Sequence, residues 1–336
     1  MASPVPESPP SAASRQARRS LTIGPTTFRV LAAVALGLLC TIVVSGAAVR
    51  LTGSGLGCSD WPNCEPGDFV SVSNPNQAIE QLNRLFTGLV SASVIAAVLG
   101  SLRRRPYRRD LVWWSLGLVA GVLGQIVLGG ITVLVELHPA AVAGHFVLSM
   151  VLVANAVVLL RRSSQPEGPR APVVGTPDLW IARVAVALAC GLIITGPVVT
   201  GSGPHAGDAA APRFGLSIVA TTRVHSIVMW CFLVVLVVLL VRVVRSGDTD
   251  PAHAPGILRR GQWLLAIVVA QGAIGYTQYF LGIPPGLVLA HIAGATAVFA
   301  TLVWFHLGLS APTGSAEPDV DAPGPAVARP APVQAS

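Results

Sequence analysis

Histidines at a repeated spacing are the residues of this sequence that could do chemistry. His145 ends the stretch 125–145 (QIVLGGITVLVELHPAAVAGH), and His291 ends the stretch 271–291 (QGAIGYTQYFLGIPPGLVLAH). In both stretches a Gly follows the leading Gln by four residues, a Pro by fourteen and the His by twenty, so the offset stays at 146. A match of this length without an insertion indicates an internal duplication.

A second repeated motif leads to two more polar residues. GAAV and TGSG within 46–55 are similar to GPVV and TGSG within 196–203. The helix expected after each motif carries a polar residue near its outer end, Asn83 in the first half and His225 in the second. Together with the two histidines above, these residues should lie at similar depth in four even-numbered helices.

Two facing helices with one His each, at one depth, are what an axial pair on heme iron requires. Zinc is less favoured, because it takes four tetrahedral ligands and often Cys. The other interpretation is a His hydrogen-bonded to a neighbouring helix, but recurrence in register with the duplication favours the iron site. Gly129, Gly130 and Gly275 leave space either for a flat macrocycle or for close helix packing.

Charged residues lie near the same ends of the helices. Arg50, Arg84 and Arg223 could pair with heme propionates or extend to the membrane interface, and both interpretations stay open. Glu80 precedes Asn83 by three residues and so shares its helix face. It is either a catalytic carboxylate or a favourable partner of the helix dipole.

The composition is that of an integral membrane protein. The chain has 336 residues, of which 52% are hydrophobic and only 11% charged, against about 25% charged in soluble domains. The net charge of +7 comes from arginines that cluster between apolar spans, which indicates membrane topology and not nucleic-acid binding. Eight spans have about the 20 residues needed to cross a bilayer: 28–49, 80–102, 111–135, 140–160, 179–199, 217–241, 261–281 and 286–308.

The arginines also set the orientation. They precede the first span, separate the second from the third, follow the fourth, and separate the sixth from the seventh. The positive-inside rule then places both termini in the cytoplasm of a multi-pass protein, in the bacterial plasma membrane. Each half has an even number of spans, so the halves should be parallel repeats about an axis along the membrane normal.

The expected organisation is an all-α membrane protein of two four-helix bundles. Residues 28–160 form the first half and 179–308 the second, joined by a cytoplasmic linker at 161–178. Disordered cytoplasmic tails are expected at 1–27 and 309–336. A mitochondrial targeting peptide is the rival interpretation of the first tail, but its prolines argue against the amphipathic helix of such peptides.

Cys58 and Cys64 share a polar loop on the outer side, separated by five residues. That side is oxidising in bacteria, so a disulfide is expected there. It would act either as a structural staple of the loop or in thiol–disulfide exchange.

Four motifs together resemble the heme A synthase family, over about residues 28–308: VRLTGSGLGCSDWPNC (49–64), IEQLNRL (79–85), LGGITVL (128–134) and the spaced Pro139 and His145. The resemblance implies eight transmembrane helices in two similar halves. It implies oxidation of the C8 methyl group of heme O to the formyl group of heme A, by successive hydroxylations. The product would serve cytochrome c oxidase assembly, with heme O synthase as a further partner and the lipid bilayer as the surroundings.

The resemblance also assigns roles to residues. His225 and His291 would be the axial ligands of heme b, the cofactor of the second half, with Arg223 beside it. The first half would hold heme O with His145 as one ligand, and Glu80 matches a catalytically important glutamate of the family.

Three further positions complete this comparison. Cys58 and Cys64 match the outer-loop pair of bacterial members. The motif reads E-x-x-N where much of the family has E-x-x-H, so Asn83 takes the place of a second ligand at the substrate heme, next to Arg84. One iron face would then be open, with Asn83 able to hydrogen-bond a ligand there.

Two other functions use the same features. A cytochrome b-type electron-transfer protein would hold heme b with the same histidines and convert no substrate. A secondary transporter also has repeats and intramembrane polar residues, but here these residues lie near the outer surface. A homo-oligomer is left open.

Overall fold

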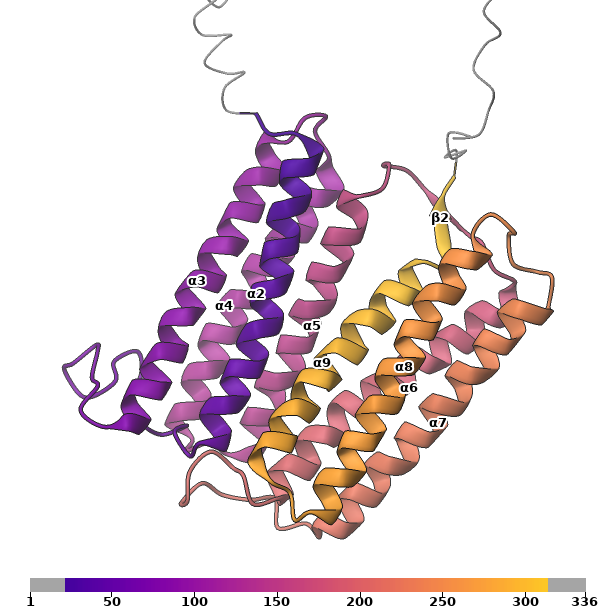
Figure 1. Ribbon diagram of the computed structural model, residues 1–336. Helices are drawn as coiled ribbons and strands as arrows, with labels where there is room; N and C mark the ends of the chain where they lie inside the picture. The colour runs from indigo at the N-terminus through magenta and orange to yellow at the C-terminus, as the bar shows by residue number, and fades with distance from the viewer. Residues whose placement is uncertain (1–21, 314–336) are drawn as a thin grey trace, which may run out of the picture.

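Long helices build almost all of the chain that the structure describes, residues 22–313 of a computed structural model (Figure 1). In chain order the elements are α2 (Pro25–Leu51), α3 (Pro75–Arg103), α4 (Arg109–Leu134), α5 (Pro139–Ser163), β1 (Arg170–Pro172), α6 (Thr176–Ser202), α7 (Ile218–Arg245), α8 (Ala254–Phe280), α9 (Pro285–Leu307) and β2 (Ser310–Pro312).

The helices begin where the sequence supplies proline and a capping side chain. Pro75 opens α3, and the side chain of Asn74 accepts a hydrogen bond from the backbone N–H of Gln77 (3.0 Å). Pro139 opens α5 after His138, whose ring accepts from a backbone N–H of the first turn. Proline at the first helical position lacks only an N–H that would have no partner there, so these residues fix the helix starts at little cost.

Seven of the described helices are long and apolar enough to cross a membrane: α2, α3, α4, α5, α6, α7 and α9. Large apolar side chains on their outer faces are more than half exposed, as on Val30, Leu82 and Trp113. Such a surface would be unfavourable in water and suits lipid. The chain is therefore a multi-pass membrane protein.

The eighth expected span, 261–281, corresponds to α8, which does not reach that level of hydropathy within the described residues. Gln262, Gln271 and Gln278 lower its mean hydropathy. That α8 also crosses the membrane stays a prediction, which is supported only by its length of 27 residues and its place beside α7 and α9.

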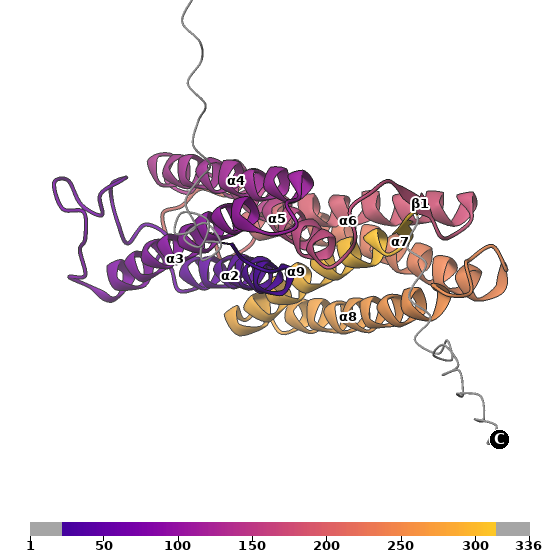
Figure 2. The same cartoon turned by 90° about the horizontal axis from the view of Figure 1, so that it is seen from above.

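The helices form two groups, α2 to α5 and α6 to α9, which can be followed in Figures 1 and 2. In the first, α2 packs on α3 and α5, and α4 packs on the same two helices. In the second, α6 and α8 each pack on α7 and α9. Each group has an apolar core, around Phe28, Leu118 and Met150 in the first and around Phe232 and Phe305 in the second. The groups meet mainly through α9 against α2 and α5, and through α5 against α6.

Both ends of the described chain lie at one end of the molecule, called here the terminal end; the opposite end, with the loop 52–74, is the loop end (Figure 1). At the terminal end β1, inside the expected linker, pairs antiparallel with β2. Parts of the two expected tails are therefore ordered: α2 begins at Pro25, and β2 spans Ser310–Pro312. The remainder of the tails lies outside the described residues.

The helices α4 and α8 end in the same way at the loop end. Leu137 and Ile283, which are 146 positions apart, have left-handed φ angles of 59° and 63°. Each donates its backbone N–H to the carbonyl five residues earlier, at 2.8 and 2.7 Å. The residues before them, Glu136 and Gly282, also have positive φ, which closes a Schellman motif at both helix ends.

Candidate functional site

The four candidate ligand positions lie at one level of the molecule. Asn83, His145, His225 and His291 come six to eight residues after the first residues of α3, α5, α7 and α9, respectively. All four helices start at the loop end, so these side chains lie about 9–12 Å along their helices from it. The sequence predicted this shared depth.

His225 and His291 are brought together by α7 and α9. Their ring centroids are 6.4 Å apart, and the ring planes are inclined by 68°. A metal bonded to one nitrogen of each ring, at about 2 Å per bond with the ring centre about 1 Å farther, would separate the centroids by about 6 Å. The spacing therefore fits one metal atom held between two imidazoles.

Neighbouring helices fix both rings. Thr195 of α6 places its Oγ1 2.8 Å from Nδ1 of His225, which leaves Nε2 of this ring for another partner. The His291 ring lies against Gly275 of α8, where a Cβ would come within 3.0 Å of Cε1. Gln271 donates to the backbone carbonyl of His291 at 2.5 Å. Nδ1 of His291 is buried without a partner among residues 22–313, which is unusual for a ring that only packs in a core.

His145 has the same surroundings in the first half. A Cβ on Gly129 of α4 would lie 3.3 Å from Cε1 of His145. Gln125 donates to the His145 carbonyl at 3.2 Å and to Ser149 at 2.7 Å. Nδ1 of His145 is again buried and has no partner in the described chain. The leading Gln of each repeated stretch thus positions the helix that carries the His, a role that the sequence analysis missed although the Gln recurred in register.

Asn83 occupies the first-half position that corresponds to His225. Ser45 of α2 lies 2.8 Å from Asn83 Oδ1, as Thr195 lies 2.8 Å from His225. Ser45 and Thr195 each come directly before the Gly of the repeated GAAV or GPVV motif. Both hydroxyl residues were missed from the sequence, because Ser and Thr are common in membrane helices and neither one stands out alone.

Glu80 and Arg84 hold the loop that precedes α3. Glu80 is only 6% exposed; its Oε2 accepts the backbone N–H of Cys58 (2.8 Å), and its Oε1 accepts two hydrogen bonds from Arg84 (2.7 and 3.0 Å). Arg84 also donates to the carbonyls of Asn63 (2.9 Å) and Asp60 (3.2 Å). The donors predicted for a propionate are thus bonded to protein oxygens, so Arg84 anchors the loop.

The expected disulfide joins Cys58 and Cys64, and both residues are fully buried. Between them Trp61 lies on Gly130 of α4, where a Cβ would come within 2.7 Å of the indole. The segment 58–64, called here the disulfide loop, therefore packs against the first half at the loop end of the molecule. This contact explains one glycine of the repeated stretch by close packing with an aromatic ring.

Two predicted propionate partners differ in their surroundings. Arg223 is exposed and makes no hydrogen bond or ion pair with any residue of the described part. Arg50 donates to the carbonyl of Thr200 (3.2 Å) and so links the two halves. Arg223 is thus the one whose guanidinium is available to a ligand.

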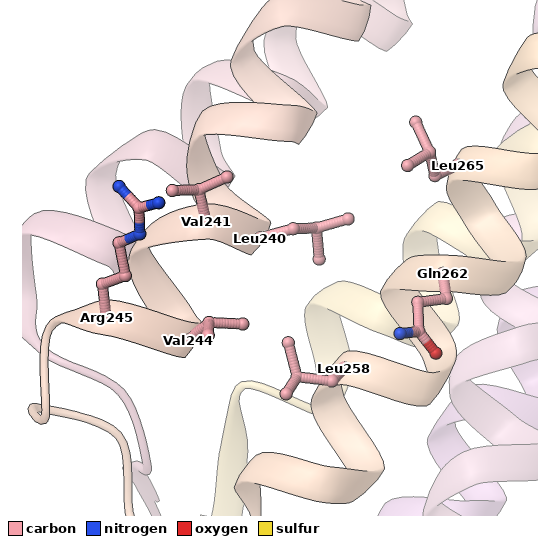
Figure 3. Close-up of a pocket in the computed structure, with 7 residues that line it drawn as sticks. All are labelled: Leu240, Val241, Val244, Arg245, Leu258, Gln262 and Leu265. Atoms are coloured by element: carbon pink, nitrogen blue, oxygen red, sulfur yellow. The ribbon is translucent and has the colours of Figure 1, made fainter.

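A cavity of about 340 Å³ lies between α7 and α8 near the terminal end (Figure 3). Leu240 on its wall is fifteen residues beyond His225, or about 22 Å along the helix, so the cavity is separate from the histidine pair. Its lining consists of Leu240, Val241, Val244, Arg245, Leu258, Gln262 and Leu265. No group of three or more His, Cys, Asp or Glu side chains suited to a metal occurs within residues 22–313.

Comparison with known proteins places the chain in a family. The model of the COX15-CtaA family, described as cytochrome oxidase assembly protein, matches residues 29–77 and 69–303. The chain is 32% identical over 134 residues to a heme A synthase of Bacillus pumilus, covering 39% of this chain and 43% of that protein. A heme A synthase of Lysinibacillus sphaericus is 32% identical over 134 residues, covering 40% and 42%.

A third relative, a heme A synthase of Halalkalibacterium halodurans, is 29% identical over 138 residues, covering 40% of this chain and 45% of its own. The chain thus aligns with less than half the length of each of these relatives. The family model, by contrast, extends over nearly all the described helices. This chain belongs to the COX15-CtaA family of cytochrome oxidase assembly proteins.

Proposed function

We propose that this protein is a heme A synthase, which oxidises the C8 methyl group of heme O to the formyl group of heme A for assembly of cytochrome c oxidase. Membership of the family and the names of the relatives support this function. The observation that carries it is the pair His225 and His291, with ring centroids 6.4 Å apart. That separation suits iron between two axial imidazoles.

Heme b would be the resident cofactor of the second half. His225 and His291 would be its ligands, and Gly275 leaves the space that the His291 ring occupies. Arg223, whose guanidinium is exposed and unpaired among residues 22–313, lies two residues before His225, toward the loop end, where it could pair with a propionate. Heme supplies electron transfer and oxygen chemistry when bound; the chain supplies the ligands and their orientation.

The first half would bind heme O, with His145 as the ligand that faces α4. Gln125 and Gly129 position this side chain from that helix. The disulfide loop, tied down by Glu80 and Arg84, would limit the access of water from the loop end. Glu80 then acts on the reaction chiefly through the loop that it holds.

The two halves would be parallel copies of one four-helix unit. The matching helix ends at Leu137 and Ile283, and the matching bonds from Gln125 and Gln271 to the carbonyls of the two histidines, support this arrangement. The arginines at the terminal end support a cytoplasmic position for both termini in a bacterial plasma membrane. Heme O synthase would supply the substrate.

Co-expression tests the function directly. The full chain would be produced together with heme O synthase in a host without heme A synthase, and the extracted hemes identified by mass spectrometry. Heme A should accumulate. A protein that carries heme b and leaves heme O unchanged would instead be an electron-transfer cytochrome, the alternative that the histidine pair alone would also satisfy.

A further inference from the structure

The two halves share one frame but differ at one ligand position. In the second half the hydroxyl of Thr195 bonds Nδ1 of His225, so the ring nitrogen Nε2 remains for iron. In the first half the hydroxyl of Ser45 is 2.8 Å from Oδ1 of Asn83. The same hydroxyl position thus holds an imidazole in one half and an amide in the other.

We propose that Asn83 is a hydrogen-bond donor, and not a ligand, at the open face of a five-coordinate heme held by His145 alone. The proposal rests on the function proposed above and adds the coordination state of its two hemes. The second half would hold a six-coordinate heme, closed on both faces by His225 and His291. The first half would then be the only place where a small exogenous ligand can reach iron.

The hydrogen bonding of Asn83 carries this assignment. Its Oδ1 accepts from the Ser45 hydroxyl, and its Nδ2 makes no hydrogen bond with any described residue. A neutral amide nitrogen has two N–H donors and no lone pair to offer a metal. With the oxygen held by Ser45, the side chain presents a donor where His225 presents a ring nitrogen.

The surroundings of His145 agree with a single ligand. Its ring packs on Gly129, as the His291 ring packs on Gly275, and both Nδ1 atoms are buried and unpaired in the described chain. One of the two ligand positions is therefore the same in both halves. Only the other has changed from a ligand to a hydrogen-bond donor, which in heme proteins governs the binding of ligands to iron.

Spin state and carbon monoxide binding test the proposal on the full-length protein purified with both hemes. We expect equal amounts of high-spin and low-spin heme by electron paramagnetic resonance, and an absorbance shift with carbon monoxide in half of the reduced heme. Asn83→His should convert the first heme to low spin and reduce the carbon monoxide-sensitive fraction from half to none. Two low-spin hemes in the unmodified protein would overturn the proposal.

The donor role has its own readout, the C–O stretching frequency of bound carbon monoxide. A donor beside the ligand polarises the C–O bond and lowers this frequency, so Asn83→Leu should raise it while binding persists. A frequency that stays the same or falls would show that the amide offers no donor there. The low-spin signal of the second heme reports in both Asn83 variants whether the chain has folded.

The matched control changes the second half to the arrangement of the first. His225→Asn, with Thr195 in place to hold the amide, should open the second heme and raise the carbon monoxide-sensitive fraction from half to all. A second heme that stays closed in this variant would count against the comparison of the halves. A protein that takes up no heme at all would refute the proposed function, whereas low-spin heme in both halves would refute only this inference.

Discussion

Replacing Glu80 should loosen the disulfide loop, and any effect on the oxidation of heme O should follow from this loosening. The carboxylate is nearly buried and accepts hydrogen bonds from the backbone of Cys58 and from Arg84. Glu80→Ala would remove all of these bonds. Because Cys58 and Cys64 are fully buried, their disulfide can be reduced only when the loop opens.

The size of the effect follows from the groups left without partners. A buried N–H that loses its acceptor costs about 1–3 kcal/mol, and hydrogen bonds to a charged group contribute about 1.5–3 kcal/mol. The Arg84 side chain is 21% exposed and would recover part of its loss from water. A net change of about 3 kcal/mol in the free energy of loop opening corresponds to about 100-fold.

Two measurements check this value. Hydrogen exchange of the peptide that contains the Cys58 amide should be about 100-fold faster in Glu80→Ala. Reduction of the disulfide by a phosphine should accelerate by a similar factor. Glu80→Gln retains one acceptor oxygen and should give about 10-fold, since only part of the hydrogen bonding is lost.

Asp68→Asn is the matched control, because this exposed carboxylate lies in the same loop and its side chain bonds to no described residue. It should change neither rate. If Glu80→Ala abolished heme A formation while exchange and reduction stayed at their original rates, the anchoring role would be refuted. Glu80 would then act on the substrate itself.

Three further outcomes are expected. His225→Ala should remove the low-spin heme absorbance, and an undiminished spectrum would contradict the axial pair. Gly275→Val should lower the heme content of the second half, because a Cβ there already comes within 3.0 Å of the His291 ring; unchanged heme content would show that the ring moves freely. Asp178→Asn should destabilise the protein by about 1–2 kcal/mol and so lower its melting temperature in detergent. The reason is that this fully buried carboxylate pairs with Arg242, which is 38% exposed. An unchanged melting temperature would argue against a stabilising pair.

Much of the fold follows from local signals in the sequence. Apolar runs of bilayer length predicted helix boundaries within five residues of the observed ones, except that α8 begins seven residues before the expected span. The hydropathy of α8 is the exception, because Gln262, Gln271 and Gln278 interrupt its apolar surface. Its place beside α7 and α9 is a matter of helix packing, which hydropathy does not reveal.

The candidate site could be predicted in part. The positions of His225 and His291 near the outer ends of even-numbered helices predicted that they lie at one depth, but the ring separation depends on how α7 and α9 pack. The role of Glu80 could not be read from its helix. Arg84 is its partner four residues later on α3, a contact that helix spacing does predict. The backbone of Cys58 meets Glu80 only because the disulfide loop folds back over the start of α3, and no spacing rule encodes that path.

The helix α9 of the second group carries His291 and also packs on α2 and α5 of the first group. Loss of the heme bound by the second group would therefore loosen the packing of α9 on α2 and α5. We expect the two sites to be filled in a mutually dependent way, so that preparations contain chains with both or with neither more often than independent filling would give. Counting bound groups per molecule by native mass spectrometry would reveal such a distribution.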